Sequence, residues 1–146
     1  MLLPDQNIVA ISIIFRKFNI WNNDRCAHLG LTAAQVPVIA VVCETGGISQ
    51  NELVERVCLE KSVVAKSVAK LMEAGYITRQ QSKTDHRAYD LFPTDHALAI
   101  YPEVVEISRA CMDHLAEGMS EEEKAAFCRL LQKVRDNALK LNASER

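Results

Sequence analysis

The chain has 146 residues, of which 49% are hydrophobic and 25% are charged, and its formal net charge is −2. This length suits one domain with helical extensions, and the composition is ordinary for a globular protein with a substantial core. No apolar run approaches the ~18 residues of a membrane span and the N-terminus lacks a signal-peptide pattern, so we expect a cytoplasmic protein.

Residues 5–24 predict a long amphipathic helix. Apolar side chains recur at three- and four-residue steps, at Ile8, Ile11, Phe15 and Phe18. A helix this apolar suggests burial against a partner subunit. The alternative is a helix that packs across its own domain. Residues 22–31 are expected to form a loop.

A second helix is predicted from Thr32 to about Thr45. Thr32 and Gln35 have the spacing of a capping box, and Gly46 follows the last helical residue. Pro37 lies just past the first turn, where its missing N–H leaves a carbonyl without its helical partner. We therefore expect a local bend or a bound water at Pro37.

Two short helices follow in residues 49–75. Ser49 can cap the first of them together with Glu52, and this helix is expected to end near Arg56–Val57. The second runs from about Lys61 to Ala74, before Gly75. It has an apolar stripe on one face and polar residues on the other, namely Val64, Val68 and Leu71 against Lys61, Ser62, Lys66 and Lys70. This arrangement is typical of a helix-turn-helix.

Two strands are predicted next, at residues 76–81 and 88–92. The segment between them, Ser82–Arg87, is too polar to be buried. A hairpin beside a helix-turn-helix is a wing, so the fold class is mainly α with a small β-hairpin wing. A helical hairpin followed by an unrelated surface hairpin also fits this pattern.

The C-terminal third predicts two more helices. Thr94 is the expected N-cap of a helix that extends to about Gly118, and Pro102 is expected to kink or split it near Ile100–Tyr101. Ser120 and Glu123 form the capping box of the last helix. Its apolar stripe comprises Phe127, Leu130, Leu131, Val134, Ala138 and Leu141, and the chain is expected to fray from Asn142.

Charge is unevenly distributed along the chain. Residues 61–87 contain six basic and two acidic residues, a net of +4, so the remainder carries −6. Residues 95–123 contain eight carboxylates and only Arg109 as a base. A basic patch on an acidic protein focuses a polyanion onto one surface, which favours nucleic acid as a partner despite the negative total.

The five cysteines include no CxxC pair, so they predict neither a zinc knuckle nor a thioredoxin-like motif. Cys43, Cys58 and Cys128 lie in apolar patterns and are expected to be buried. Cys26 lies in a polar stretch and is expected to be the exposed thiol, the candidate for a redox sensor. The four histidines show no paired metal spacing, and we expect no metal and no cofactor. No glycine-rich phosphate loop or nucleophile elbow supports an enzyme.

At this point the chain resembles a MarR-family transcriptional regulator over nearly its whole length. The strongest part of the resemblance is Asp85-His86-Arg87-Ala88, which matches the wing-tip signature. The other matching positions are Leu31, Thr32, Gln35, Ser49, Glu52, Leu53, Lys61, Ser62, Val64, Val68, Leu71, Gly75, Ile77, Arg79, Thr94, Ser120–Glu123, Leu130 and Leu131. Ser67, Pro93 and Ala97 depart from the family pattern, which bears on local packing.

The resemblance implies one MarR-like domain over residues 1–146, with a winged-helix DNA-binding part at 32–94 and dimerisation helices at 5–24 and 95–142. It implies a homodimer that binds double-stranded DNA and represses transcription. The implied DNA-binding residues are Gln50, Lys61, Ser62, Val63, Lys66, Lys70, Lys83, Asp85, His86 and Arg87. Arg87 suits a narrow minor groove, and Asp85 is expected to hold its guanidinium.

Relatives of this kind respond to small aromatic or phenolic ligands, and Arg16, Trp21 and His28 are the candidate lining of such a site here. Two alternatives stay open. One is a winged-helix module that binds protein rather than DNA, which the overall acidity favours. The other is a cysteine-based, redox-responsive regulator.

Overall fold

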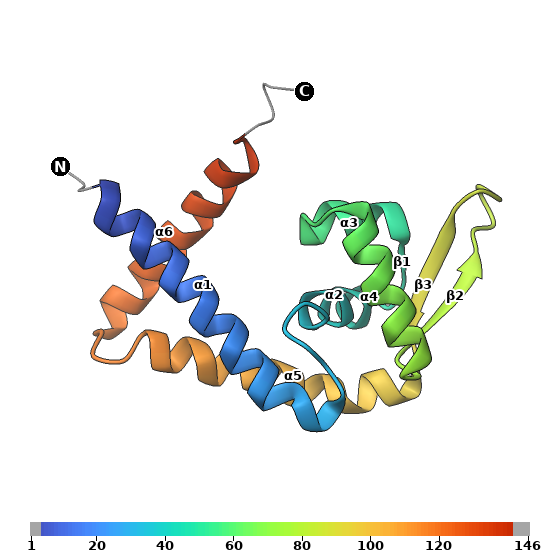
Figure 1. The fold of residues 1–146 in the computed structure, drawn as a ribbon, viewed down its shortest axis with the longest axis horizontal. Helices are drawn as coiled ribbons and strands as arrows, with labels where there is room; N and C mark the ends of the chain where they lie inside the picture. Colours follow the sequence, from blue (N-terminus) through green and yellow to red (C-terminus); the bar gives the residue numbers. More distant parts are fainter. Residues whose placement is uncertain (1–3, 142–146) are drawn as a thin grey trace. The chain divides into compact units, whose positions relative to one another are not determined.

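The computed structural model describes residues 4–141. Contacts group the chain into two compact units, one ending at Cys111 and one beginning at Met112. The elements in chain order are α1 (Pro4–Cys26), the 3-10 turn η1 (Ala27–Leu29), α2 (Val36–Thr45), β1 (Ile48–Ser49), α3 (Gln50–Val57), α4 (Lys61–Glu73), β2 (Ile77–Gln81), β3 (Tyr89–Pro93), α5 (Asp95–Leu115) and α6 (Glu121–Leu139) (Figure 1). None of the helices between residues 4 and 141 is long and apolar enough to span a bilayer.

Helix α1 is longer than the sequence predicts, so the expected loop at residues 22–31 is wrong in its first half. The helix continues to Cys26 and passes into η1 before Gly30, whose φ of 72° ends the turn. Asn22 and Cys26 are both fully buried, one helical turn apart. Burial of this inner face explains why a polar stretch of sequence stays helical.

Helix α2 begins at Val36 rather than at Thr32. Thr32 donates its backbone N–H to Gln35 Oε1 at 3.0 Å, but residues 33–35 form a turn that precedes the helix. Pro37 is therefore the second residue of α2, where a backbone N–H has no helical acceptor to lose. The stated cause of the expected bend or water at Pro37 therefore does not apply.

The core of the first unit lies under the helix-turn-helix and the sheet. Its fully buried side chains include Ile39 from α2, Leu53 from α3, Val64 from α4, Leu91 from β3 and Val104 from α5. The sheet has the order β1-β3-β2 with all pairs antiparallel. The two-residue strand β1 was not predicted, because two residues are too few to show an alternating pattern.

Helix α5 runs from Asp95 to Leu115 with Pro102 inside it, so the predicted split near Ile100–Tyr101 does not occur. Proline removes the N–H that would bond the carbonyl of Leu98. Because the side chain of Leu98 is 47% exposed, water has access to this part of the helix and can solvate that carbonyl.

The second unit contains α6, whose N-terminus has the complete capping box that the sequence predicts. Glu123 donates its backbone N–H to Ser120 Oγ at 3.1 Å, and Ser120 donates its N–H to Glu123 Oε2 at 2.8 Å. Three glutamates in the first turn also suit the positive end of the helix dipole.

Ser120→Ala is expected to lower the free energy of unfolding by about 1 kcal/mol, because the Glu123 N–H loses its side-chain acceptor. Urea unfolding followed by circular dichroism measures this. Ser120→Asp retains an acceptor and should stay close to the wild-type value. Equal losses in both variants would show that the cap is not the cause.

Candidate nucleic-acid interface

Helices α3 and α4 form the predicted helix-turn-helix. Ser49 Oγ accepts the backbone N–H of Glu52 at 3.2 Å, which starts α3 at the expected place. Cys58 ends α3 in the left-handed region, with φ of 51°, and α4 follows at Lys61. Val64, Val68 and Leu71 are buried, as predicted, so one face of α4 is anchored in the core.

The opposite face of α4 is open to solvent. It carries the five residues of this helix that the sequence singled out, which are Lys61, Ser62, Val63, Lys66 and Lys70. All are exposed, and Val63 retains 40% of its surface although it is apolar. This face presents three cations, one hydroxyl and one methyl-bearing side chain, the groups that bind phosphates and base edges.

The wing lies beside α4 and is formed by β2 and β3 (Figure 1). At its tip, Lys83, Asp85, His86 and Arg87 are all exposed. Asp85 Oδ1 accepts the backbone N–H of Arg87 at 3.0 Å. Within the described chain no ion pair joins the two side chains, so Asp85 shapes the turn rather than holding the guanidinium as expected.

A pocket of about 260 Å³ lies among α3, α4 and the wing. Its lining includes the cationic side chains Lys61, Arg79 and Arg87, together with Gln50 and Asn51, and contains no carboxylate. The Arg79 guanidinium lies 4.3 Å from the centre of the Tyr89 ring, which fixes it over an aromatic face. Three cations around one small pocket are groups of the kind that bind phosphate.

Three polar or aromatic residues of this pocket, Asn51, Arg79 and Tyr89, were not among the predicted DNA-binding residues. The signal for Arg79 and Tyr89 was their place on two adjacent strands. Arg79 pairs with Leu91 and Gln81 with Tyr89, so Arg79 and Tyr89 are diagonal neighbours on one face of the hairpin. The sequence gives the two strands but not this register.

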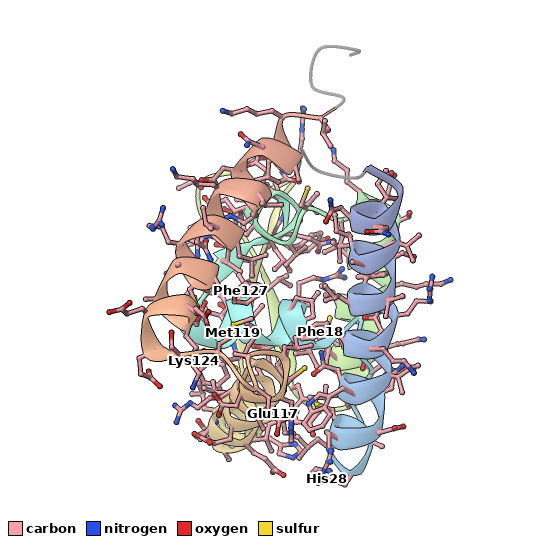
Figure 2. The ribbon with its side chains drawn as sticks, turned by 90° about the vertical axis from the view of Figure 1, so that its left-hand side faces the viewer. Phe18, His28, Glu117, Met119, Lys124 and Phe127 are labelled. Carbon is pink, nitrogen blue, oxygen red and sulfur yellow. The ribbon has the colours of Figure 1, made fainter. Side chains whose placement is uncertain are left out.

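The three candidate ligand-lining residues point to other partners. Arg16 donates to Ser12 Oγ at 2.6 Å, and Trp21 Nε1 donates to the carbonyl of Ile107 at 3.3 Å. His28, just past the end of α1 (Figure 2), contacts Glu103 Oε1 at 2.5 Å. Trp21 and His28 therefore tie α1 and η1 to α5.

A cavity of about 860 Å³ lies elsewhere in the first unit, and none of those three residues lines it. It is bounded by α1, the turn before α2 and the start of α2, the turn between α3 and α4, the first turn of α4, and one residue of α5. Phe15 and Phe18 contribute from α1, and Figure 2 shows Phe18 projecting from that helix. Cavities of roughly 300–1,000 Å³ accommodate drug-sized ligands.

The burial of three of the five cysteines differs from the prediction. Cys26 is fully buried rather than exposed, whereas Cys58 and Cys128 are exposed rather than buried. Burial, and then the negative charge of Glu103, raise the pKa of the Cys26 thiol. A raised pKa keeps the group protonated near neutrality, so Cys26 lacks the thiolate character of a redox sensor.

We expect the exposed thiols Cys58 and Cys128 to react with Ellman's reagent in the native protein, and the buried Cys26 to react only on unfolding. The Cys58→Ser and Cys26→Ser variants assign the phases of the absorbance trace. Loss of the fast phase in the Cys26 variant would contradict this assignment.

Residues 29–88 match the model of the MarR family. The HTH-type transcriptional regulator YybA of Bacillus subtilis is 27% identical over 127 residues, covering 87% of this chain and 85% of YybA. A MarR protein from Peptoclostridium difficile is 29% identical with a TM-score of 0.91, covering 100% of this chain and 97% of that chain.

A third similar protein was solved with nucleic acid. It is a MarR-family regulator from Listeria monocytogenes complexed with a 26mer DNA, and it shares the fold at a TM-score of 0.85 and 24% identity, covering 94% of this chain and 93% of that chain. The family model, the sequence relatives and the shared winged-helix fold agree. The chain is therefore similar to the MarR family of transcriptional regulators, whose family model matches residues 29–88.

Proposed function

We propose that this chain binds double-stranded DNA as a homodimer, through α4 and the wing, and thereby represses transcription. The observation that carries the proposal is the concentration of exposed cations on α4 and around the 260 Å³ pocket of a chain whose net charge is −2. The related Listeria protein was solved with DNA bound to the same fold. Repression follows when a dimer occupies promoter DNA and excludes polymerase. The proposed function is binding, and it includes no catalysed chemical reaction.

Helix α4 reads the major groove in this proposal. Its anchored face holds the helix rigidly, and its exposed face meets the duplex. Ser62 bonds a base or a phosphate, and Val63 contacts a thymine methyl group. Lys66 and Lys70 neutralise phosphates, with Gln50 at the start of α3 as a further backbone contact.

The 260 Å³ pocket among α3, α4 and the wing, called the basic pocket below, is the proposed binding site for one DNA phosphate. Lys61, Arg79 and Arg87 converge on it from α4, β2 and the wing. One phosphate held there fixes the register of α4 in the groove, because phosphate contacts position a protein while base contacts specify sequence. From the wing side of this pocket, Arg87 enters the adjacent minor groove of the DNA. Lys83 and His86 then contact phosphates of the DNA backbone next to that groove.

Dimerisation is proposed from two apolar faces. On α1, Ile8, Ile11 and Phe15 retain 65%, 63% and 66% of their surface, and on α6 Leu130 and Val134 retain 48% and 56%. Side chains of this kind at helical spacing are unfavourable in water at about 25 cal/mol per Å² of apolar surface. A second copy covers them and sets two α4 helices in successive grooves, about 34–36 Å apart.

The proposed division of the chain follows the roles of its elements. Residues 32–94 carry the DNA-reading part, and the helices in 5–24 and 95–142 carry the dimer contacts. The response to a ligand is proposed at the 860 Å³ cavity, because its walls include both α1 and residues of the helix-turn-helix. A small aromatic molecule is the expected effector.

Selection of genomic DNA fragments on the immobilised protein, followed by sequencing, tests the proposal. We expect enrichment of fragments with two inverted half-sites whose centres lie about one helical turn apart. A reporter driven by an enriched promoter should fall when the protein is expressed. Recovery of proteins from a lysate without enrichment of any duplex would instead favour the protein-binding module.

A further inference from the structure

Arg79 and Tyr89 share one face of the wing, at its base. Alternate residues of a strand lie on the same side, so Arg79 lies on the side of Ile77 and Tyr89 on the side of Leu91. Because Ile77 and Leu91 are only 3% and 0% exposed, this side of the hairpin faces the core. Arg79 and Tyr89 continue it beyond the core, where both are exposed and both line the basic pocket.

These two side chains contact each other directly. The guanidinium carbon of Arg79 lies 4.3 Å from the centre of the Tyr89 ring, within the range of a cation–π contact. Among the residues that the structure describes, no carboxylate forms an ion pair with Arg79. A carboxylate would neutralise the guanidinium, whereas an aromatic ring orients it and leaves its charge and its N–H donors available to an anion. Arg79 is therefore a cation that is held in place but not neutralised.

The backbone that carries Arg79 is fixed by strand pairing. Ser82 donates its backbone N–H to the carbonyl of Ala88 at 3.0 Å, which extends the pairing of β2 and β3 toward the tip of the wing. Arg79 therefore lies inside the paired part of β2, whereas Arg87 lies in the turn that joins the strands. A cation on a fixed backbone loses less conformational freedom on binding than a cation on a turn.

We propose that Arg79 is the principal phosphate ligand of the basic pocket and that Tyr89 is its positioning residue. The Tyr89 ring holds the guanidinium so that its N–H groups meet the phosphate oxygens, and Lys61 adds positive charge from α4. A guanidinium suits this role because its planar donors bond two phosphate oxygens at once. This assignment rests on the proposed DNA binding. It places the contact that sets the register of α4 at the base of the wing rather than at its tip.

Two substitutions of Tyr89 test the role of its ring. Tyr89→Leu removes the ring and is expected to weaken binding to a genome-selected duplex about 5–25-fold, because an exposed cation–π contact contributes about two- to fivefold in each subunit of the proposed dimer. Tyr89→Phe keeps the ring and should stay within about twofold of wild type. Gln80→Leu, on the opposite face of the hairpin, is the matched control and should also retain affinity. Equal losses in Tyr89→Leu and Tyr89→Phe would overturn the role of the ring.

A double-mutant cycle tests whether Tyr89 acts through Arg79. Arg79→Ala is expected to lower the affinity at least ~10-fold for selected and scrambled duplexes alike, since a phosphate contact carries no sequence information. The slope of log Kd against log salt should fall by about 1.8, because one phosphate contact is lost in each of two subunits. In this background Tyr89→Leu should cost less than about twofold more, because no guanidinium remains to be held. A full further loss would overturn the proposal, since Tyr89 would then act on the DNA or on the folding of the wing directly.

Inorganic pyrophosphate probes the same pocket without DNA, by isothermal titration calorimetry on the full chain at low salt. Arg79→Ala is expected to weaken pyrophosphate binding at least ~10-fold, and Tyr89→Leu about two- to fivefold. The Tm of both variants should stay near the wild-type value, because both side chains are exposed. Equal pyrophosphate binding by the wild type and Arg79→Ala would overturn the inference. A protein that binds pyrophosphate in this manner but no duplex refutes the proposed function alone, and one whose duplex affinity is unchanged in Arg79→Ala refutes this inference alone.

Discussion

Arg87→Ala is expected to weaken binding to a genome-selected duplex about 100-fold. Each subunit of the proposed dimer inserts one Arg87 into a minor groove, and each loss costs about tenfold, since contacts of this kind contribute about 1–3 kcal/mol. Fluorescence anisotropy with a labelled duplex measures the change. The Tm should stay near the wild-type value, because the Arg87 side chain is exposed and makes no ion pair within the described residues.

Arg109→Ala is the matched control for this experiment. Arg109 is exposed on α5 and, among the residues that the structure describes, forms an ion pair with Glu106, one turn earlier, at 3.1 Å. We expect its removal to leave duplex affinity within twofold of wild type, since about 0–1 kcal/mol is typical of an exposed pair. Equal affinity of the Arg87 variant and the wild type would remove the wing from the account and leave α4 as the only reading element.

The double variant Ile11→Glu, Val134→Glu is expected to be a monomer with duplex affinity lowered about 10²–10⁴-fold. Ile11 on α1 and Val134 on α6 are 63% and 56% exposed in the single chain. Dimerisation would bury four introduced carboxylates, which is strongly unfavourable. A monomer then loses the gain that two linked half-site contacts provide.

Sedimentation velocity gives the oligomeric state in this test, and anisotropy gives the duplex affinity. Lys17→Glu, Lys133→Glu is a matched control, because it introduces the same residue at exposed polar positions of the same two helices. This control should remain dimeric. A wild-type protein that sediments as a single subunit at micromolar concentration would refute the dimer directly.

Much of the fold could be predicted because local signals agree with the tertiary structure. Ser120 and Glu123 form the predicted capping box, and Val64, Val68 and Leu71 form the predicted buried stripe. The end of α3, the bounds of α4 and both wing strands also fall within one residue of where the patterns place them. In each case a short-range rule about caps or periodicity is sufficient.

The errors arise where a distant contact decides the outcome. Asn22 and Cys26 look like loop residues in sequence, but they lie on the inner face of α1 and are fully buried. Arg79 and Tyr89 meet only because β2 and β3 pair in one register. Pro37 was misread because the start of α2 was placed four residues too early. Burial, register and cavity walls depend on packing, which a single sequence does not display.

The most direct measurement of the central claim is a salt titration of the binding to a genome-selected duplex. If cations on α4 and around the basic pocket neutralise phosphates, log Kd should rise linearly with log salt, and a dimer that makes about 6–10 phosphate contacts loses ~10³–10⁵ in affinity between 50 and 200 mM salt. The account predicts this steep dependence for the wild type and a shallower slope for Arg87→Ala. An affinity that does not change with salt, or no duplex binding even at the lowest salt, would contradict it.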